Sequence, residues 1–280
     1  MPAIQLARLK TQIHALTWVF TRPYEFRDQI RALFQEYAEQ AYRPGVVLLG
    51  SRRALAYRTP ALLLRQLEQE LTPLVHENPG ATLMLVDVLW EETHLEPRQL
   101  AAFLLGQTRL PDPEEIIARV NSWCLPTLER GSLTALLNQG CAGLRRNHAS
   151  RWLELVERWS SHPAPSFQSI ALQALLPAVQ SREFMNIPPI FQIISLLFTS
   201  HSATVQTHLI EVIFALARRE PIETTSVLQN VLAENPTPET IRVVRRSLPA
   251  FKPNFQRILR HFLVAISSQS TAEEPEAGAA

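Results

Sequence analysis

The chain is short of several residue types, and each shortage excludes a class of structure. Its 8 glycines in 280 residues fall well below the usual share of roughly 7%, so few positions suit the tight turns of β-hairpins. The two cysteines, Cys124 and Cys141, do not have the spacing of a metal or redox motif. No apolar run approaches the ~20 residues that cross a membrane, and residues 1–10 lack a signal-peptide pattern. We therefore expect an all-α protein of the reducing cytoplasm that has no membrane partner.

Recognisable catalytic and cofactor motifs are also missing. The sequence has no phosphate-binding loop, no dinucleotide fingerprint and no Gly-x-Ser-x-Gly elbow. His201 and His208 are seven residues apart, but no acid or cysteine completes a metal-ligand set with them. We expect neither a metal nor a cofactor.

A regular spacing of prolines is the clearest feature that is present. Pro189, Pro221 and Pro253 follow one another at intervals of 32 residues, and each opens an apolar segment. Proline is favoured at the first position of a helix, where its missing N–H has no partner to lose. A second amphipathic segment precedes each one, so the predicted helix pairs cover residues 167–179 and 189–198, 205–216 and 221–232, and 240–251 and 253–262. A period in the thirties built from helix pairs predicts an α-solenoid, a superhelix of HEAT-like repeats.

The remainder of the chain also shows helical periodicity. The predicted helices cover residues 5–20, 23–41, 60–77, 80–92, 97–107, 113–123, 128–138 and 150–160. Pro73 is expected to kink or end the third of these. Residues 42–58 read as a loop with at most one helical turn. We predict one solenoid domain over residues 1–266 and a disordered acidic tail over residues 267–280.

Positive charge is concentrated late in the chain. The formal net charge is +1, yet residues 141–269 carry 13 basic and 8 acidic side chains. The densest group of cations consists of Arg242, Arg245, Arg246, Lys252, Arg257 and Arg260, with Glu239 as the one acid among them. Arg242, Arg245 and Arg246 share one helical face. Guanidinium forks suit phosphate oxygens, although the polar outer face of a terminal repeat would have the same composition.

Three smaller basic groups accompany this one. The second comprises Arg145, Arg146, His148 and Arg151 at a predicted helix start, where a DNA backbone could run. The third comprises Arg52, Arg53 and Arg58. Arg218 and Arg219 end a predicted helix, where they would offset its dipole.

Several short motifs, taken in order, resemble the bacterial DNA alkylation repair proteins, which are alkylpurine DNA glycosylases built from HEAT-like repeats. The motifs are Arg58-Thr59-Pro60, then Leu89-Trp90 followed by Glu96, Arg98, Ala101-Ala102 and Leu104-Leu105, then Asn121-Ser122-Trp123. The resemblance covers roughly residues 25–250. It implies a curved helical array that grips duplex DNA by its backbone. It also implies a carboxylate among aromatic side chains that stabilises the cationic sugar as the alkylated base leaves.

The catalytic positions of that family are changed in this chain. With Trp123 on the family's tryptophan, Thr127 occupies the place of the catalytic aspartate, and a slip of one residue places Leu128 there. Glu129 is the nearest acid but faces another side of the helix. Further on, Ser169 replaces an arginine and Val212 replaces a second tryptophan.

Three functions follow from these observations. The first is non-specific binding of double-stranded DNA, with Trp123 stacking on a nucleotide and the arginine groups on phosphates, in a protein that lacks the catalytic acid. The second is a scaffold whose groove binds a protein partner, in which case Trp123 is a core residue. The third is a glycosylase that uses Glu129 or another acid.

Overall fold

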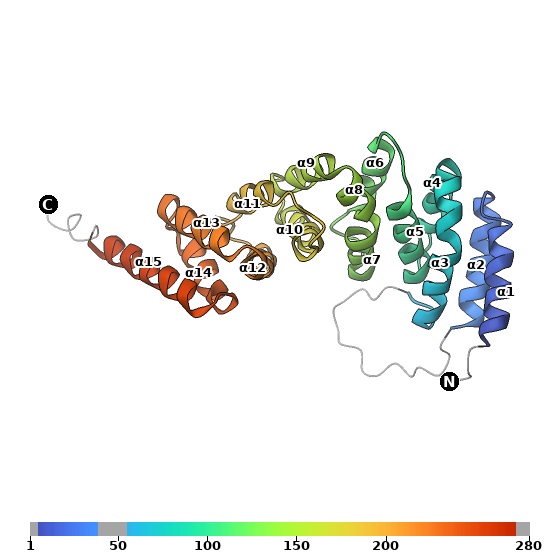
Figure 1. Cartoon of the computed structure of the whole chain (residues 1–280), viewed down its shortest axis with the longest axis horizontal. Helices are drawn as coiled ribbons and strands as arrows, with labels where there is room; N and C mark the ends of the chain where they lie inside the picture. The colour runs from blue at the N-terminus through green and yellow to red at the C-terminus, as the bar shows by residue number, and fades with distance from the viewer. Residues whose placement is uncertain (1–4, 39–54, 273–280) are drawn as a thin grey trace. The chain divides into compact units, whose positions relative to one another are not determined.

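The structure, a computed structural model, describes residues 5–38 and 55–272 (Figure 1). Over these residues the regular structure is helical, apart from one isolated β-bridge between Leu55 and His94. The predicted all-α, solenoid-like class is confirmed. The chain forms two compact units, residues 1–148 and 149–280.

The first unit is built from helices in two layers. They are α1 (Leu6–Thr17), α2 (Pro23–Glu36), α3 (Ala61–Glu77), α4 (Pro79–Trp90), α5 (Leu95–Gln107), α6 (Glu114–Trp123), α7 (Arg130–Ala135), the π-helix η1 (Leu136–Gly140) and α8 (Ala142–Asn147). Helices α1, α3 and α5 pack in sequence, and α2 packs on α4. On α3 the residues Leu63, Leu67, Leu71 and Val75 recur every fourth position and are fully buried, which is the apolar stripe of an amphipathic helix.

Helix α5 is buried on most of its surface because it contacts α3, α4, η1, α7 and α8. The C-terminal end of α5 lies close against η1, and glycine residues make this close approach possible. A Cβ atom added at Gly106 would be 1.9 Å from the carbonyl oxygen of Gln139, and one added at Gly143 would be 2.7 Å from the oxygen of Gly106. Only glycine permits this approach between backbones. Where the sequence predicted one helix over residues 128–138, the structure has α7, η1 and α8.

The second unit contains the repeated helix pairs. Its helices are α9 (Ala149–Ser160), α10 (Pro165–Gln180), α11 (Pro188–Ser195), α12 (Ala203–Arg219), α13 (Pro221–Glu234), α14 (Pro238–Ser247), the short 3₁₀ helix η2 (Leu248–Ala250) and α15 (Pro253–Ala272). Helices α10, α12 and α14 pack in one row, and α9, α11, α13 and α15 pack in a second row. The three predicted pairs are therefore present, and Pro221 and Pro253 open their helices while the third begins one residue early, at Pro188.

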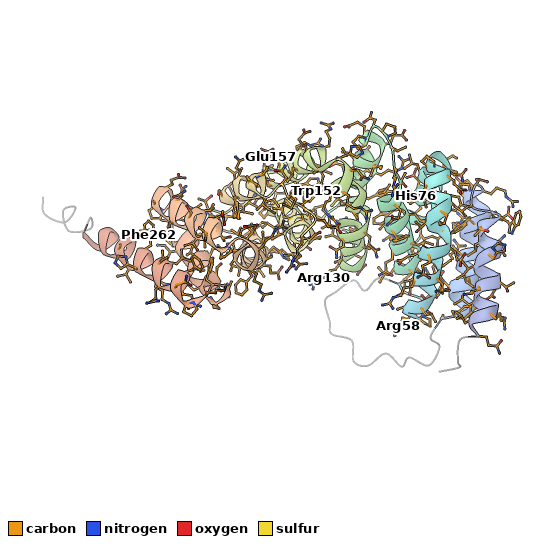
Figure 2. All side chains as sticks on the ribbon, in the orientation of Figure 1. Arg58, His76, Arg130, Trp152, Glu157 and Phe262 are labelled. Carbon is orange, nitrogen blue, oxygen red and sulfur yellow. The ribbon has the colours of Figure 1, made fainter. Side chains whose placement is uncertain are left out.

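Trp152 and Trp159 of α9 belong to the core of this unit. They are 0% and 3% exposed. Trp152, which Figure 2 labels, meets Phe184 edge to face with ring centroids 5.3 Å apart.

Two helices depart from the prediction, one at an internal proline and one at its C-terminal end. Helix α3 continues through Pro73 to Glu77, because fully buried Leu71 and Val75 flank the proline and their packing offsets the ~3 kcal/mol that an internal proline costs. Helix α15 reaches Ala272 and so includes the first part of the predicted tail. The remaining tail, residues 273–280, and most of the predicted loop, with Arg52 and Arg53, lie outside the described residues.

Candidate nucleic-acid interface

Two tryptophans end neighbouring helices of the first unit and stack on each other. Trp90 is the last residue of α4 and Trp123 the last of α6. Their ring centroids are 4.5 Å apart and the rings are inclined by 11°. The Arg98 side chain donates from Nε to the Trp90 carbonyl at 3.2 Å and places its guanidinium 5.9 Å from the Trp90 ring centroid. Trp90 is buried and Trp123 half-buried, so Trp123 is partly core and partly accessible.

A buried carboxylate holds the segment that leads into α3. Glu96 lies in the first turn of α5 and is 4% exposed. It accepts hydrogen bonds from the backbone N–H groups of Tyr57, Arg58 and Thr59 at 3.0, 2.5 and 3.4 Å. Arg58 has a φ of 57°, a left-handed conformation that a non-glycine residue seldom adopts, and the Glu96 bonds stabilise it.

The motifs that carried the family resemblance therefore meet in space. Glu96 binds the backbone of Arg58 and Thr59, while Trp90 contacts both Arg98 and Trp123. Segments separated by 33 to 38 residues in the sequence form one cluster at the ends of α4, α5 and α6.

The candidate acid beside Trp123 has a structural partner. Glu129 is the N-cap of α7, and its two carboxylate oxygens accept from the N–H groups of Gly131 at 2.7 Å and Ser132 at 2.9 Å. This is the contact that favours acidic side chains at helix starts. Thr127 is exposed and Leu128 half-buried, and neither carries a charge.

The two further positions at which the resemblance implied a change lie in the core of the second unit. Ser169 of α10 is 5% exposed and Val212 of α12 is 1% exposed. Each packs inward, so neither side chain is available to a ligand in this structure.

The second basic group contains one arginine that is hydrogen-bonded within the protein and two that are exposed. Arg145 donates to the carbonyl oxygens of Leu137 at 2.6 Å and Asn138 at 2.5 Å, and burial lowers the pKa of its guanidinium. Arg146 is exposed and reaches the Gly106 oxygen at 3.4 Å. Arg151 is exposed and pairs with Glu154 at 2.5 Å. Arg145 thus supports η1, and Arg146 and Arg151 have the more accessible guanidinium groups.

The largest basic group forms an exposed surface of the second unit, which we call the α14–α15 basic surface. It consists of Arg242, Arg245, Arg246, Lys252 and Arg257. Within the described part of the chain, none of the five makes a side-chain hydrogen bond or an ion pair. The opposite side of α14 carries Val243 and Val244, both fully buried. The nearby Arg260 is also exposed and donates to Gln256 at 3.2 Å.

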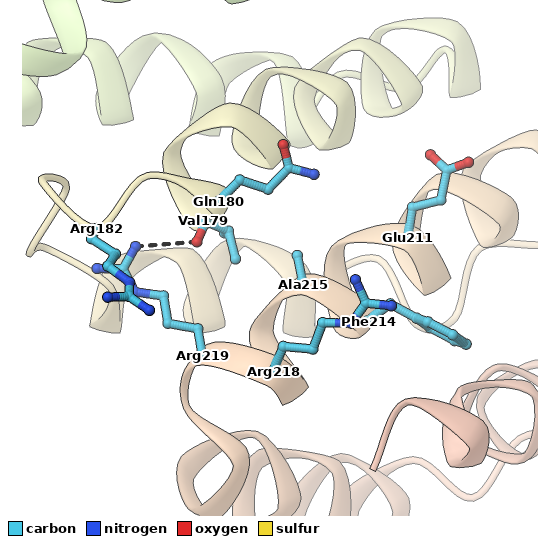
Figure 3. Close-up of a pocket in the computed structure, with 8 residues that line it drawn as sticks. All are labelled: Val179, Gln180, Arg182, Glu211, Phe214, Ala215, Arg218 and Arg219. Carbon is cyan, nitrogen blue, oxygen red and sulfur yellow. Dashed lines mark hydrogen bonds between the residues drawn. The ribbon is translucent and has the colours of Figure 1, made fainter.

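Sequence reasoning missed a polar pocket in the second unit. It has a volume of about 410 Å³ and is lined by Val179, Gln180, Arg182, Glu211, Phe214, Ala215, Arg218 and Arg219 (Figure 3). Arg182 and Arg218 are 36 residues apart, and no local pattern connects them. The Arg218-Arg219 pair is visible in the sequence, but its position at the end of a helix is equally explained by the helix dipole.

Residues 5–38 and 55–272 contain no cluster of three or more His, Cys, Asp or Glu side chains placed to hold a metal ion. None of the helices described by the structure combines the length and apolarity that a membrane span requires.

The fold and these surfaces define an all-α, solenoid-like protein with a tryptophan pair in one unit and unpaired cations in the other. Comparison with known families agrees with the resemblance seen in the sequence. Residues 32–242 match the family model described as DNA alkylation repair enzyme, and since this is most of the chain, the protein belongs to that family. No curated protein and no solved structure matches it.

Proposed function

We propose that this protein is a HEAT-like repeat member of the family that binds double-stranded DNA without sequence preference. The α14–α15 basic surface carries this proposal, because its five exposed cations make no side-chain hydrogen bond or ion pair with the described residues. Arg146, Arg151 and Trp123 are further candidate contacts.

The geometry of α14 supports contact with phosphates. Arg242, Arg245 and Arg246 follow one another at three- and four-residue steps, and the fully buried Val243 and Val244 anchor the opposite side. The guanidinium groups therefore extend away from the core. A planar guanidinium binds two oxygens of one phosphate at once, and each neutralised phosphate releases condensed counterions.

We further propose that the protein binds DNA without excising bases. Base excision in this family's manner needs a fixed negative charge where the cationic sugar forms. Thr127 and Leu128 supply none, and the Glu129 oxygens are already bonded to the start of α7. Trp123 then contacts DNA through the part of its ring that Trp90 leaves uncovered.

Salt-dependent binding tests the interface. Affinity for a fluorescent 20-base-pair duplex is measured by anisotropy between 50 and 300 mM NaCl (~20 base pairs spans about two helical turns). Loss of three phosphate contacts in Arg242/Arg245/Arg246→Ala should reduce the slope of log K against log salt by up to about 2.7. A matched variant, Arg65/Arg109/Arg158→Ala, removes the same charge from exposed arginines elsewhere and should retain the wild-type slope. Absence of duplex binding at the lowest salt would remove the proposal.

An excision assay tests the second part. The wild-type protein is incubated with a methylated duplex, and released bases are measured by chromatography. We expect release at the level of the no-protein control. Release by the wild type that disappears in Glu129→Gln, with binding retained, would instead identify an active glycosylase that uses Glu129.

A further inference from the structure

The pocket of the second unit lies between the end of α10 and the second half of α12. Val179 and Ala215 form its apolar floor, and polar side chains surround them (Figure 3). In that view Arg182 lies beside Arg219 on one side, and Glu211, Phe214 and the guanidinium of Arg218 lie on the other. Its volume of about 410 Å³ is within the range of sites that hold small organic ligands.

Of the three arginines that line the pocket, Arg219 has a structural role. Arg219 donates from Nη1 to the carbonyl oxygens of Ala178 and Val179, both at 3.2 Å, and of Ser181 at 2.5 Å, and it donates from Nη2 to the oxygen of Phe184. These bonds satisfy the last carbonyls of α10 and hold the segment that follows it. Arg219 therefore has little capacity left for a ligand.

The other two arginines are available. Arg182 and Arg218 are exposed, and neither makes a hydrogen bond or ion pair with another described residue. Both cations border the same pocket, and Arg219 fixes the backbone segment that carries Arg182. Two unpaired guanidinium groups at one pocket favour an anionic ligand.

The remaining lining restricts what that ligand can be. Glu211 contributes a carboxylate, held 3.0 Å from Nδ1 of His208, and it would repel a simple anion. Gln180 contributes an exposed amide and Phe214 a half-buried aromatic ring. The ligand must therefore be anionic at one end, carry hydrogen-bond donors at the other, and have a planar apolar face. A nucleotide has all three properties.

We propose that this pocket binds a single nucleotide displaced from a DNA duplex. Arg182 binds its phosphate, the base lies against Phe214 beside Arg218, and Glu211 and Gln180 accept from exocyclic amino groups. The inference rests on the DNA binding proposed above and adds the form of DNA that is preferred. Displacing a paired nucleotide costs a few kcal/mol, and an already unpaired nucleotide avoids most of that cost.

A pair of duplexes tests this preference directly. They are identical except that one carries a single unpaired adenosine, and both are titrated by anisotropy at one salt concentration. Stacking of a base on an aromatic side chain contributes about 1–3 kcal/mol, so we expect wild type to bind the bulged duplex about tenfold more tightly. Phe214→Leu should reduce that ratio to near one while its affinity for the paired duplex stays unchanged. The double variant Arg182→Gln/Arg218→Gln should also reduce that ratio to near one, with a small loss of affinity for both duplexes.

Controls separate the possible failures. Phe167→Leu changes another half-buried phenylalanine of this unit and should retain the wild-type ratio. Arg242/Arg245/Arg246→Ala should bind both duplexes more weakly and also retain that ratio. Equal binding of the two duplexes by wild type overturns the pocket inference and leaves the proposed function standing. Absence of binding to either duplex overturns the proposed function.

Two other outcomes would also overturn the inference. A bulge preference that survives in Phe214→Leu would mean that bent DNA is recognised elsewhere. Micromolar displacement by free deoxyadenosine monophosphate, without any bulge preference, would show that the pocket serves free nucleotides instead.

Discussion

The indole of Trp123 stacks on the indole of Trp90, with centroids 4.5 Å apart and planes inclined by 11°. The contact joins the ends of α4 and α6, so Trp123 supports the fold as well as any ligand. An offset aromatic pair contributes about 0.5–1.5 kcal/mol beyond the area that it buries. We expect Trp123→Ala to lower the free energy of unfolding by about 2 kcal/mol in urea denaturation, since Trp123 is only half-buried.

Trp123→Phe is the informative comparison because it retains a ring against Trp90. Its loss of stability should be smaller, about 1 kcal/mol. If Trp123→Ala is as stable as the wild type, the stacked pair has no structural role and the ring serves ligand binding alone.

Removal of the Glu96 carboxylate should destabilise the first unit. Three backbone N–H groups donate to it, and a buried donor left unsatisfied costs about 1–3 kcal/mol. We expect Glu96→Ala to lower the free energy of unfolding by about 3 kcal/mol, whereas Glu96→Gln keeps one acceptor and should lose about half as much. Hydrogen exchange at Tyr57 and Arg58 should accelerate in Glu96→Ala. Unchanged exchange there would mean that these amides find other acceptors.

The approach of α5 to η1 should tolerate no side chain at Gly106. Its added Cβ atom would be 1.9 Å from a backbone oxygen, which cannot rotate away as a side chain can. We expect Gly106→Ala to lower the free energy of unfolding by about 3 kcal/mol or more.

Gly80→Ala is the matched control, because an added Cβ there meets no atom within 4 Å. It lies in the first turn of α4 and should leave stability unchanged or raise it by up to about 1 kcal/mol. Equal effects of the two substitutions would contradict the close approach.

Both thiols should be inert in the folded protein. Cys124 and Cys141 are free and fully buried. Burial raises the pKa of Cys141 to about 11 and raises the pKa of Cys124 as well. The reactive thiolate is therefore scarce at pH 8. A thiol reagent at pH 8 should label two cysteines per chain in urea and neither without it within minutes. Rapid labelling of the native protein would reveal opening around α6 or the end of η1.

The Glu239 carboxylate should make stability dependent on acidic pH. Its own backbone N–H and then His201, 3.4 Å away, lower the pKa of Glu239 below its usual value of 4.5. A carboxylate with a lowered folded-state pKa stabilises the protein above pH 4.5, and that contribution is lost as pH falls through the folded pKa. We expect Glu239→Gln to be less stable than wild type at pH 7 and to lose less stability between pH 5 and 3. Parallel pH profiles for the two proteins would contradict this role.

Most of the helices could be predicted because their signals are local. Proline at the first position starts α13 and α15, and apolar periodicity marks the buried face of each helix. The predictions were wrong where contacts between residues distant in the sequence determine the local structure. Helix α3 passes through Pro73 because its flanking residues are buried, and η1 exists where Gly106 and Gly143 let α5 come close.

Prediction of the candidate site was less complete for the same reason. The composition of the α14–α15 basic surface and the positions of Trp90 and Trp123 are visible in the sequence. The Trp90–Trp123 stack and the pocket are not, since each brings together residues more than thirty positions apart.

The sequence by itself determined the all-α class, the helix pairs of the second unit and the family, because periodicity, proline placement and short motifs are properties of neighbouring residues. Only the tertiary structure decided which arginines are hydrogen-bonded within the protein and which are accessible to a ligand. Arg218 and Arg219 are chemically identical neighbours, yet one turns to the pocket and the other binds carbonyls 35 to 41 residues earlier in the chain. Successive residues on a helix point about 100° apart, so the packing of α12 on α10 assigns each its role.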